Sequence, residues 1–329
     1  MAIDVVKNRD VVAFFRASLR IIPFGWSLYT FYWKFRRFIE KNKKYSKNSS
    51  CLNFGDFSNP SLENPVSQLC TSNQLLSKVY DNWCKKIQSP PRFSRKQWEF
   101  IYILQAMKKG NLLQTGKNGL GFGCGREPLA GLLGSFGCNV TATDLDFNMA
   151  KDKGWVSTKQ HSQNLNDLFH AAKTYISKDD FYKRVNFESV DMNKIPKKFT
   201  KKFDFVWSAC ALEHLGSLQH GINFILNSVK CLKPGGTAIH TTEFNLSSND
   251  DTFESEGCSI YRAKDIIKLK VKLENEGYEV EPLNFHTGSS EVDQYIDLPP
   301  YGFSPHMKLM LESYVVTSIG IIIKNPIIK

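Results

Sequence analysis

A glycine turn followed by a carboxylate is the residue pattern with the clearest chemistry in this chain. The turn has the sequence Gly-Phe-Gly-Cys-Gly at 121–125, and the carboxylate is Asp144, which ends the β-rich run 141–144. Glycines let the backbone turn sharply and approach a ligand without a Cβ in the way. An acid about 20 residues after such a turn holds a ribose hydroxyl in nucleotide-binding βαβ units. The pattern therefore predicts a site for a ribose-containing ligand.

Three further marks follow at the ends of expected strands. The run 184–192 ends in Asp191 and Met192, and the buried-strand pattern 203–208 leads into Ala-Cys-Ala-Leu-Glu-His-Leu, which contains His214. A Leu-Lys-Pro-Gly-Gly turn then precedes another β-rich run. In an open α/β sheet, ligands bind beyond the carboxyl ends of the strands, where the strand order reverses. We therefore expect these residues to meet at one edge of a sheet.

This succession resembles the class I S-adenosylmethionine-dependent methyltransferases over about residues 112–285. The resemblance implies an α/β fold with a Rossmann-like, doubly wound, mostly parallel seven-stranded sheet, and S-adenosylmethionine as the cofactor. It also implies that Asp144 is the ribose acid and that Asp191 and Met192 hold the adenine. The cofactor-binding residues expected on this basis are Gly121, Gly123, Cys124, Gly125, Glu127, Asp144, Leu145, Asp191, Met192 and Ser208.

Two positions depart from the family pattern. Gly121 stands where the first strand of the family usually carries an acid, and Glu127 replaces the usual third glycine. We interpret Glu127 as the missing carboxylate and expect it to face the ammonium group of the cofactor. The alternative is that Glu127 only favours the first turn of the following helix, where an acid suits the helix dipole.

Methyl transfer to a hydroxyl requires removal of the acceptor proton, and a positioned base contributes roughly 10²–10⁴-fold to the rate. His214 follows the fourth strand beside the expected acceptor cleft, and an imidazole, with an ordinary pKa of about 6.5, suits a base. The alternative is that His214 belongs to the cofactor wall. Rival candidates are His161 in the long crossover, and His240 with Glu243 at the end of the fifth strand. On a strand, the odd offset between His240 and Glu243 places them on opposite faces, so we predict no metal site.

The net charge of +11 would suit nucleic-acid binding if it were spread over the catalytic region. Residues 1–50 hold 11 Lys and Arg against 3 acids, so they supply +8 and the rest of the chain carries only +3. A broad phosphate-binding surface is therefore not expected. The Asn/Asp-Pro-Pro-Tyr signature of base amino-group methylation is also missing after the fourth strand. These features disfavour a nucleic-acid acceptor.

Residues 10–40 are basic and aromatic, and two interpretations of them stay open. Their longest uncharged run, 21–33, has 13 residues, short of the roughly 20 that span a bilayer. The segment either packs as a helical layer on the domain or on a second subunit, or it lies in a membrane interface. Eight cysteines without a Cys-x-x-Cys pair favour buried free thiols in a reducing compartment. We expect a cytoplasmic protein, with peripheral membrane contact through 10–40 as the alternative.

A chain of 329 residues, 42% hydrophobic and 23% charged, can hold one large α/β domain with an extension. We expect a basic aromatic arm and linker at 1–64, a helical lead-in at 65–110 and a methyltransferase domain at 111–329. An insertion at 287–313 is interpreted as a lid or acceptor wall, because loops longer than about 12–15 residues are usually functional or disordered. The expected strands lie at 117–122, 138–143, 185–190, 203–208, 236–242, 278–285 and 314–324.

These features predict an S-adenosylmethionine-dependent methyltransferase that methylates oxygen on a saccharide or another small molecule. The run Gly-Arg-Glu-Pro at 125–128 and the run His-Met-Lys-Leu at 306–309 look similar to those of bacterial-type methyltransferases of glycan pathways. Two other classes stay open: a nucleic-acid methyltransferase, and a non-catalytic, membrane-associated scaffold with the same fold. The turn glycines, Asp144 and Asp191 disfavour the scaffold.

Overall fold

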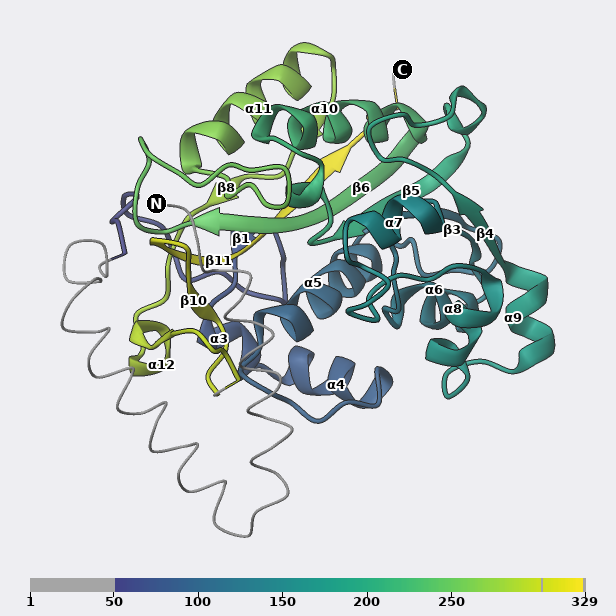
Figure 1. Cartoon of the computed structure of the whole chain (residues 1–329), viewed down its shortest axis with the longest axis horizontal. Helices are drawn as coiled ribbons and strands as arrows, with labels where there is room; N and C mark the ends of the chain where they lie inside the picture. The colour runs from purple at the N-terminus through teal and green to yellow at the C-terminus, as the bar shows by residue number, and fades with distance from the viewer. Residues whose placement is uncertain (1–50, 303, 328–329) are drawn as a thin grey trace, which may run out of the picture.

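A twisted eleven-stranded sheet with helices on both faces forms the centre of the molecule (Figure 1). The computed structural model describes residues 51–302 and 304–327. The segment 10–40 lies outside these ranges, so its contact with a membrane stays a prediction, as do the domain limits at residues 64 and 110. In the ranges described, no helix is both long and apolar enough to cross a bilayer.

The secondary structure alternates strands and helices through most of the chain. The strands are β1 (Ser67–Leu69), β2 (Asn118–Phe122), β3 (Asn139–Asp144), β4 (Val185–Ser189), β5 (Phe203–Ala209), β6 (Leu232–Asn245), β7 (Glu279–Val280), β8 (Leu283–Asn284), β9 (Ile296–Asp297), β10 (Lys308–Leu311) and β11 (Tyr314–Lys324). The α-helices are α3 (Ser72–Leu75), α4 (Lys78–Lys86), α5 (Arg95–Lys109), α6 (Leu129–Ser135), α7 (Phe147–Asp152), α8 (Leu165–Ala172), α9 (Lys178–Arg184), α10 (Leu218–Ser228), α11 (Ala263–Asn275) and α12 (Glu291–Gln294). Short 3₁₀ helices are η1 (Lys197–Phe199), η2 (Leu212–His214) and η3 (Val229–Cys231).

The parallel half of the sheet has the strand order β4-β3-β2-β5-β6. β2 pairs in parallel with β3 on one side and with β5 on the other. The chain therefore leaves β2 in one direction through β3 and β4, and returns to its other side through β5 and β6. This reversal of strand order beside β2 is where doubly wound sheets bind ligands. The α/β, Rossmann-like fold class is confirmed.

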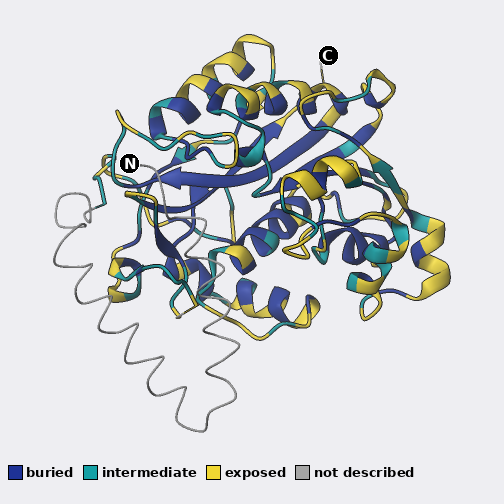
Figure 2. Ribbon diagram, in the orientation of Figure 1, coloured by how far each residue is buried: buried dark blue, intermediate teal, exposed yellow. Residues whose placement is uncertain are grey.

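Strand β5 supplies side chains to two separate cores. Phe205 and Trp207 belong to the core under α5 and α6, whereas Val206 belongs to the core under α10 and α11. All three side chains are fully buried, and the strands of the sheet centre are dark blue in Figure 2. Successive side chains of a strand point to opposite faces, so a strand covered on both faces has the continuous apolar pattern found here.

The antiparallel half of the sheet is centred on β11, which lies between β6 and β1. β11 also pairs with β10 and with β7. The sheet has four strands more than the seven predicted, because β1, β9 and β10 were not expected and the strand expected at 278–285 is divided into β7 and β8. These strands, β1 and β7 to β10, have two to four residues each, which is too short for a hydrophobic alternation to reveal.

Two segments differ from the secondary structure expected for them. The lead-in 65–110 is not helical throughout, because β1 joins the sheet through pairs with β11 and β8. The strand expected at 278–285 is divided into β7 and β8 around Pro282, which has no backbone N–H to donate to a sheet. Pairing with distant strands determines β1, whereas a proline within the expected strand separates β7 from β8.

The insertion 287–313 contains α12, β9 and β10, and it reaches the start of α5. The backbone N–H of His306 donates to the carbonyl oxygen of Phe93 over 2.7 Å, and the N–H of Arg95 donates to the carbonyl oxygen of His306 over 3.0 Å. His306 is thereby held beside the first turn of α5.

Candidate active site

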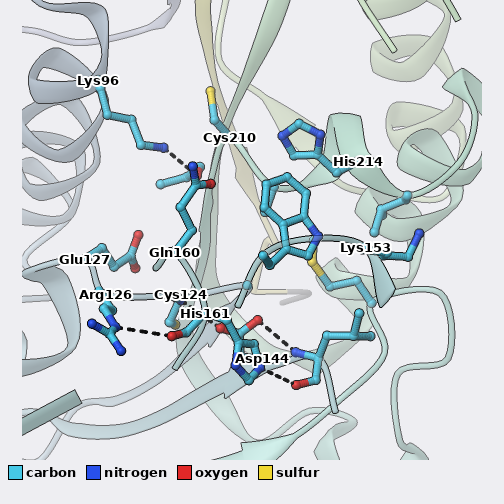
Figure 3. Close-up of a pocket in the computed structure, with 18 of the residues that line it drawn as sticks. Lys96, Cys124, Arg126, Glu127, Asp144, Lys153, Gln160, His161, Cys210 and His214 are labelled. Atoms are coloured by element: carbon cyan, nitrogen blue, oxygen red, sulfur yellow. Dashed lines mark hydrogen bonds between the residues drawn. The ribbon is translucent and has the colours of Figure 1, made fainter. Parts of the chain in front are cut away.

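A cavity of about 740 Å³ lies at the carboxyl ends of β2, β3 and β5 (Figure 3). Its lining comes from the glycine turn after β2, the end of β3, the segment after β5, and the stretch between α7 and α8. The first turn of α5 and His306 complete the wall. The volume falls within the about 300–1,000 Å³ that is usual for small-molecule sites.

The glycine turn requires glycine at two positions. Gly123 and Gly125 have φ angles of 59° and 50°, in the left-handed region that side chains disfavour. A Cβ at Gly125 would lie 2.4 Å from the carbonyl oxygen of Gln160, and a Cβ at Gly123 would lie 2.8 Å from the Cβ of Ala211. The turn therefore borders the cavity with bare backbone, and the buried Cys124 between these glycines also lines it.

The Asp144 carboxylate is tied to the glycine turn. Its Oδ2 accepts hydrogen bonds from the backbone N–H groups of Gly125 (3.2 Å) and Ser162 (3.1 Å), and its Oδ1 accepts from Leu145 (2.8 Å). Burial raises the pKa of Asp144, and these donors oppose that rise. Because a carboxylate has about four acceptor positions, capacity for ribose hydroxyls remains.

Glu127 lines the cavity, and its neighbours only partly offset the cost of ionising its buried carboxyl group. The indole Nε1–H of Trp207 donates to its Oε1 over 2.7 Å. Burial nevertheless raises the pKa of Glu127 to about 8, against the opposing effects of that hydrogen bond and of the Lys96 ammonium. Glu127 lies directly before Pro128, the N-cap residue of α6, and outside the first turn of that helix, so its alternative role at the helix dipole stays a prediction.

Asp191, Met192 and Leu145 also lie in the cavity wall. Oδ1 of Asp191 accepts a hydrogen bond from the backbone N–H of Asn193 over 2.8 Å, which fixes the carboxylate at the end of its strand. Met192 is largely buried, and its sulfur packs against the turn, 3.3 Å from where a Cβ of Gly123 would stand. The structure thus brings the acids and the apolar neighbour of the predicted cofactor site to one cavity.

Two residues predicted to bind the cofactor do not line the cavity, and we correct them here. Gly121 lies within β2, where a Cβ would stand 2.3 Å from Cζ2 of Trp207. Packing against that indole explains the glycine. Ser208 is fully buried, and its hydroxyl contacts Nδ1 of His240 at 2.8 Å. Both residues therefore contact other residues inside the sheet and not the cavity.

His214 and His161 both line the cavity, but protein atoms engage their rings. Nδ1 of His214 lies 2.6 Å from the carbonyl oxygen of Gly257, and its Nε2 lies 3.9 Å from Oε1 of Glu213. Nε2 of His161 lies 2.7 Å from the carbonyl oxygen of Leu145, beside the predicted ribose site rather than the acceptor. In each ring a backbone carbonyl oxygen lies against one nitrogen, and among the residues described neither ring has a carboxylate within hydrogen-bond distance, since 3.9 Å from Glu213 is too long.

The prediction of His240 as a base is wrong. The side chain is fully buried between Ser208 and Ser228, whose hydroxyls contact Nδ1 (2.8 Å) and Nε2 (3.1 Å). Burial lowers the pKa of His240 to about 3. The ring therefore stays neutral and cannot take up a proton from an acceptor in the cavity.

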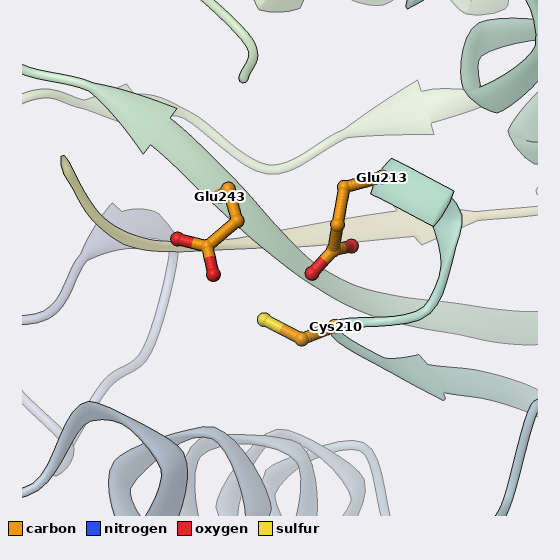
Figure 4. A group of neighbouring side chains, drawn as sticks. All are labelled: Cys210, Glu213 and Glu243. Atoms are coloured by element: carbon orange, nitrogen blue, oxygen red, sulfur yellow. The ribbon is translucent and has the colours of Figure 1, made fainter. Parts of the chain in front are cut away.

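Glu243 belongs to a buried ion-pair cluster behind the cavity wall rather than to the cavity. Its Oε1 lies 2.5 Å from Nη2 of Arg95, and burial together with the neighbouring carboxylates raises its pKa to about 7 despite that contact. Figure 4 shows Glu243, Glu213 and Cys210 pointing toward one another from β6, η2 and the end of β5. Their ligand atoms lie within 4.8 Å of one another.

The ligand atoms of this cluster are close enough together to hold a metal ion, but the cluster lacks the unneutralised negative charge that a metal site requires. The guanidinium of Arg95 already supplies the positive charge next to Glu243. Burial raises the pKa of the Cys210 thiol, which donates to Oε1 of Glu99 over 2.9 Å, so it is a thiol and not the thiolate that metals bind. We therefore assign the cluster a structural role in holding the first turn of α5.

Several cavity residues carry no signal in the sequence pattern. Arg95 and Lys96 line the cavity because α5 begins beside it, and Trp155 does so from the long crossover. His306 comes from the insertion, whose length and whose His-Met-Lys-Leu run at 306–309 were the indications of a role in the sequence.

The sequence matches the family described as "Methyltransferase domain" over residues 100–282, which is more than half of the chain. No curated protein matches the sequence.

Solved structures that match this chain include three methyltransferases of low sequence identity. Magnesium protoporphyrin IX methyltransferase from Synechocystis PCC 6803, with bound S-adenosylhomocysteine, is 13% identical, with a TM-score of 0.41 over 76% of this chain and 96% of that chain. Phosphoethanolamine N-methyltransferase 2 from Haemonchus contortus is 20% identical, with a TM-score of 0.40 over 64% and 44% of the two chains. A proposed sarcosine dimethylglycine methyltransferase from Galdieria sulphuraria is 14% identical, with a TM-score of 0.39 over 56% of this chain and 60% of that chain.

Proposed function

The chain belongs to the methyltransferase-domain family, and on that premise we propose that it transfers a methyl group to a hydroxyl oxygen of a saccharide or another small molecule. It is an S-adenosylmethionine-dependent enzyme of the class I superfamily. The proposal concerns the acceptor, and one observation carries it. Imidazole side chains line the same cavity as the predicted cofactor residues, and a hydroxyl, unlike a free amine, must lose a proton to be methylated at a useful rate.

The cavity residues suit S-adenosylmethionine, which supplies an activated methyl group when bound. Gly123 and Gly125 leave bare backbone for the amino-acid tail. We assign Asp144 to the ribose hydroxyls, and Asp191 with Met192 to the adenine. The raised pKa of Glu127, to about 8, marks a carboxyl that lacks a strong cationic partner, and the cofactor's ammonium group would supply one.

The size and lining of the cavity favour a small acceptor. At about 740 Å³ it has room for the cofactor and a compact second ligand. Trp155 offers an aromatic face at this wall, and its ring meets His214 edge to face at a centroid distance of 4.6 Å. Aromatic rings commonly pack on apolar faces while polar tips remain available to partners. A sugar ring, apolar on its faces and hydroxylated at its edge, matches such a wall.

A labelled-methyl screen tests the acceptor class. The full chain is incubated with S-adenosylmethionine labelled in its methyl group and, separately, with methyl glycosides, phenols, primary amines and an RNA mixture. We expect label on a glycoside or phenol oxygen. Transfer only to an amine or to RNA would overturn O-methylation while leaving the methyltransferase assignment intact.

We also propose a reducing compartment, the cytoplasm, as the place of action. All eight cysteines lie in the described residues as free thiols, and five of them are buried. Reduced cysteines of this kind are typical of intracellular proteins. Unchanged migration of the freshly isolated protein on gels with and without reductant is the expected result.

A further inference from the structure

His306 and Asp297 form a hydrogen-bonded pair at the edge of the cavity. Nδ1 of His306 lies 2.7 Å from Oδ2 of Asp297. The Asp297 side chain is fully buried, whereas one third of the His306 side chain (33%) is exposed, and His306 lines the cavity. The imidazole is thus anchored to the protein interior at Nδ1, in a partly exposed residue of the cavity wall.

The backbone holds this pair in place from both sides. The N–H and carbonyl groups of His306 bond to Phe93 and Arg95 at the start of α5, over 2.7 and 3.0 Å. Asp297 ends β9, which pairs with β10 just after His306. The ring of Tyr301 lies edge to face against the imidazole, with centroids 6.0 Å apart. The imidazole therefore has a defined orientation before any acceptor binds.

The carboxylate of Asp297 also selects the tautomer of the neutral imidazole ring. A carboxylate oxygen can only accept a hydrogen bond, so the hydrogen of the neutral imidazole resides on Nδ1. Nε2 then carries the lone pair, and among the described residues it has no hydrogen-bond partner. An orienting carboxylate behind an imidazole is the arrangement that makes histidine an effective base.

We propose that His306 is the catalytic base that removes the proton of the acceptor hydroxyl, and that Asp297 is its positioning residue. The proposal rests on O-methylation as the proposed function and deepens it. His214, the base expected from the sequence, has the backbone carbonyl of Gly257 rather than a carboxylate against its Nδ1. Among these imidazoles, only that of His306 has a buried carboxylate hydrogen-bonded to one nitrogen, and His306 lies in the cavity wall.

The step balances with the methyl donor of the family and no further reactant. The acceptor oxygen forms a bond to the methyl carbon, the bond between that carbon and sulfur breaks, and its electron pair stays on sulfur. The hydroxyl proton goes to Nε2 of His306 and from there to solvent. The step requires no phosphate, metal ion or oxidant.

Paired oxygen and sulfur acceptors test the role of the base. The probes are methyl β-D-glucopyranoside and 1-thio-β-D-glucose, because a thiol is partly ionised near neutral pH and depends far less on a base. We expect His306→Gln to lower transfer to the hydroxyl probe by about 10²–10⁴-fold and to change transfer to the thiol probe by less than about threefold. Asp297→Asn should follow the same pattern with a smaller loss. The exposed His220 on α10, outside the cavity lining, gives the matched control His220→Gln with unchanged rates on both probes.

The outcomes separate the two proposals. Equal loss on both probes would mean that His306 only shapes the site, and no loss on the hydroxyl probe would mean that another group is the base. Either result overturns the assignment of His306 and leaves O-methylation standing. If the unaltered protein methylates the thiol probe but no hydroxyl of the glycoside or phenol series, O-methylation itself fails, and the base assignment falls with it.

A second measurement requires neither acceptor nor cofactor. Diethyl pyrocarbonate acylates unprotonated imidazole nitrogens, and peptide mapping assigns the modified histidines in the full chain. We expect His306 to be modified and Asp297→Asn to change its modification rate several-fold, while His220 is modified at the same rate in both proteins. An unreactive His306 would show that Nε2 does not face the cavity and would overturn the proposal.

Discussion

Glu127→Gln examines whether the carboxyl beside the glycine turn binds the ammonium group of the cofactor. The substitution keeps the shape of the side chain and its contact with Trp207, but it removes the ability to ionise. The pKa of Glu127 is raised to about 8, mainly by burial. Glu127 is therefore mostly neutral at pH 7 in the free protein, and a bound ammonium would favour its ionised form.

The magnitude follows from the linkage between proton and ligand binding. At pH 7 a carboxyl with a pKa of about 8 holds about 0.9 protons, and binding of a cation next to it releases them. Since the ionised form binds the ligand, affinity rises with pH, by about tenfold per pH unit well below pH 8. A hydrogen bond to a charged group contributes about 1.5–3 kcal/mol, and ionising Glu127 at pH 7 costs about 1.4 kcal/mol. Glu127→Gln should therefore weaken binding at pH 7 by up to about fifteenfold and abolish the pH slope.

Isothermal titration calorimetry with S-adenosylhomocysteine measures both quantities. This product keeps the amino-acid tail and is titrated between about pH 5.5 and pH 6.7, at least one unit below the ordinary pKa of an α-amino group, about 7.7–8.0. Buffers of different ionisation enthalpy report the number of protons released. The control ligand is 5′-methylthioadenosine, which lacks the tail and should bind independently of pH and of Glu127→Gln.

A flat affinity between these pH values, with no proton release, would refute the assignment of Glu127. So would a Glu127→Gln protein that keeps the slope. Trp207→Phe provides a further check, because the indole N–H stabilises the ionised carboxylate through its 2.7 Å hydrogen bond. Without that donor the pKa of Glu127 should rise further, and the pH at which the slope ends should rise with it.

The remaining predictions concern the ribose acid and the packing of α10. Asp144→Asn should weaken S-adenosylhomocysteine by about 10- to 150-fold in the same calorimetric assay, because hydrogen bonds to a charged group contribute about 1.5–3 kcal/mol; an unchanged affinity would exclude Asp144 from the ribose site. Gly221→Ala would place a Cβ 1.8 Å from the hydroxyl of Tyr261, and we expect a loss of about 1–3 kcal/mol or more in the free energy of unfolding by urea. Gly257→Ala, with open space at its Cβ position, is the matched control, and an equal loss there would contradict the packing argument.

The sequence was sufficient to predict those strands and helices whose conformation is determined by their own residues. β11 lies at 314–324, the range that its β-branched run predicts. β1 could not be predicted, because three residues carry no period and the surrounding run has helical spacing. Its strand conformation depends on Gln68 pairing with Gly320, more than two hundred residues away. Tertiary pairing overrides the local preference there.

The same distinction holds for the cavity. Asp144 could be predicted because a short βα connection sets its distance from the glycine turn. The role of Gly121 could not, because a glycine that admits Trp207 looks the same in sequence as one that admits a cofactor. The partner of Glu127 lies 80 residues further along the chain. His306 lies in the cavity wall, and its backbone bonds there to Phe93 and Arg95, which are far from it in the sequence.

The central position of β11 has a consequence for biosynthesis. Residues 314–324 fill the space between β6 and β1, so a growing polypeptide that has not yet reached them carries two open sheet edges. Such edges template pairing between chains. Translation that stops before this segment would therefore release an aggregation-prone product even though the whole cofactor half had already been made, and we expect chaperones to engage the chain until β11 has left the ribosome.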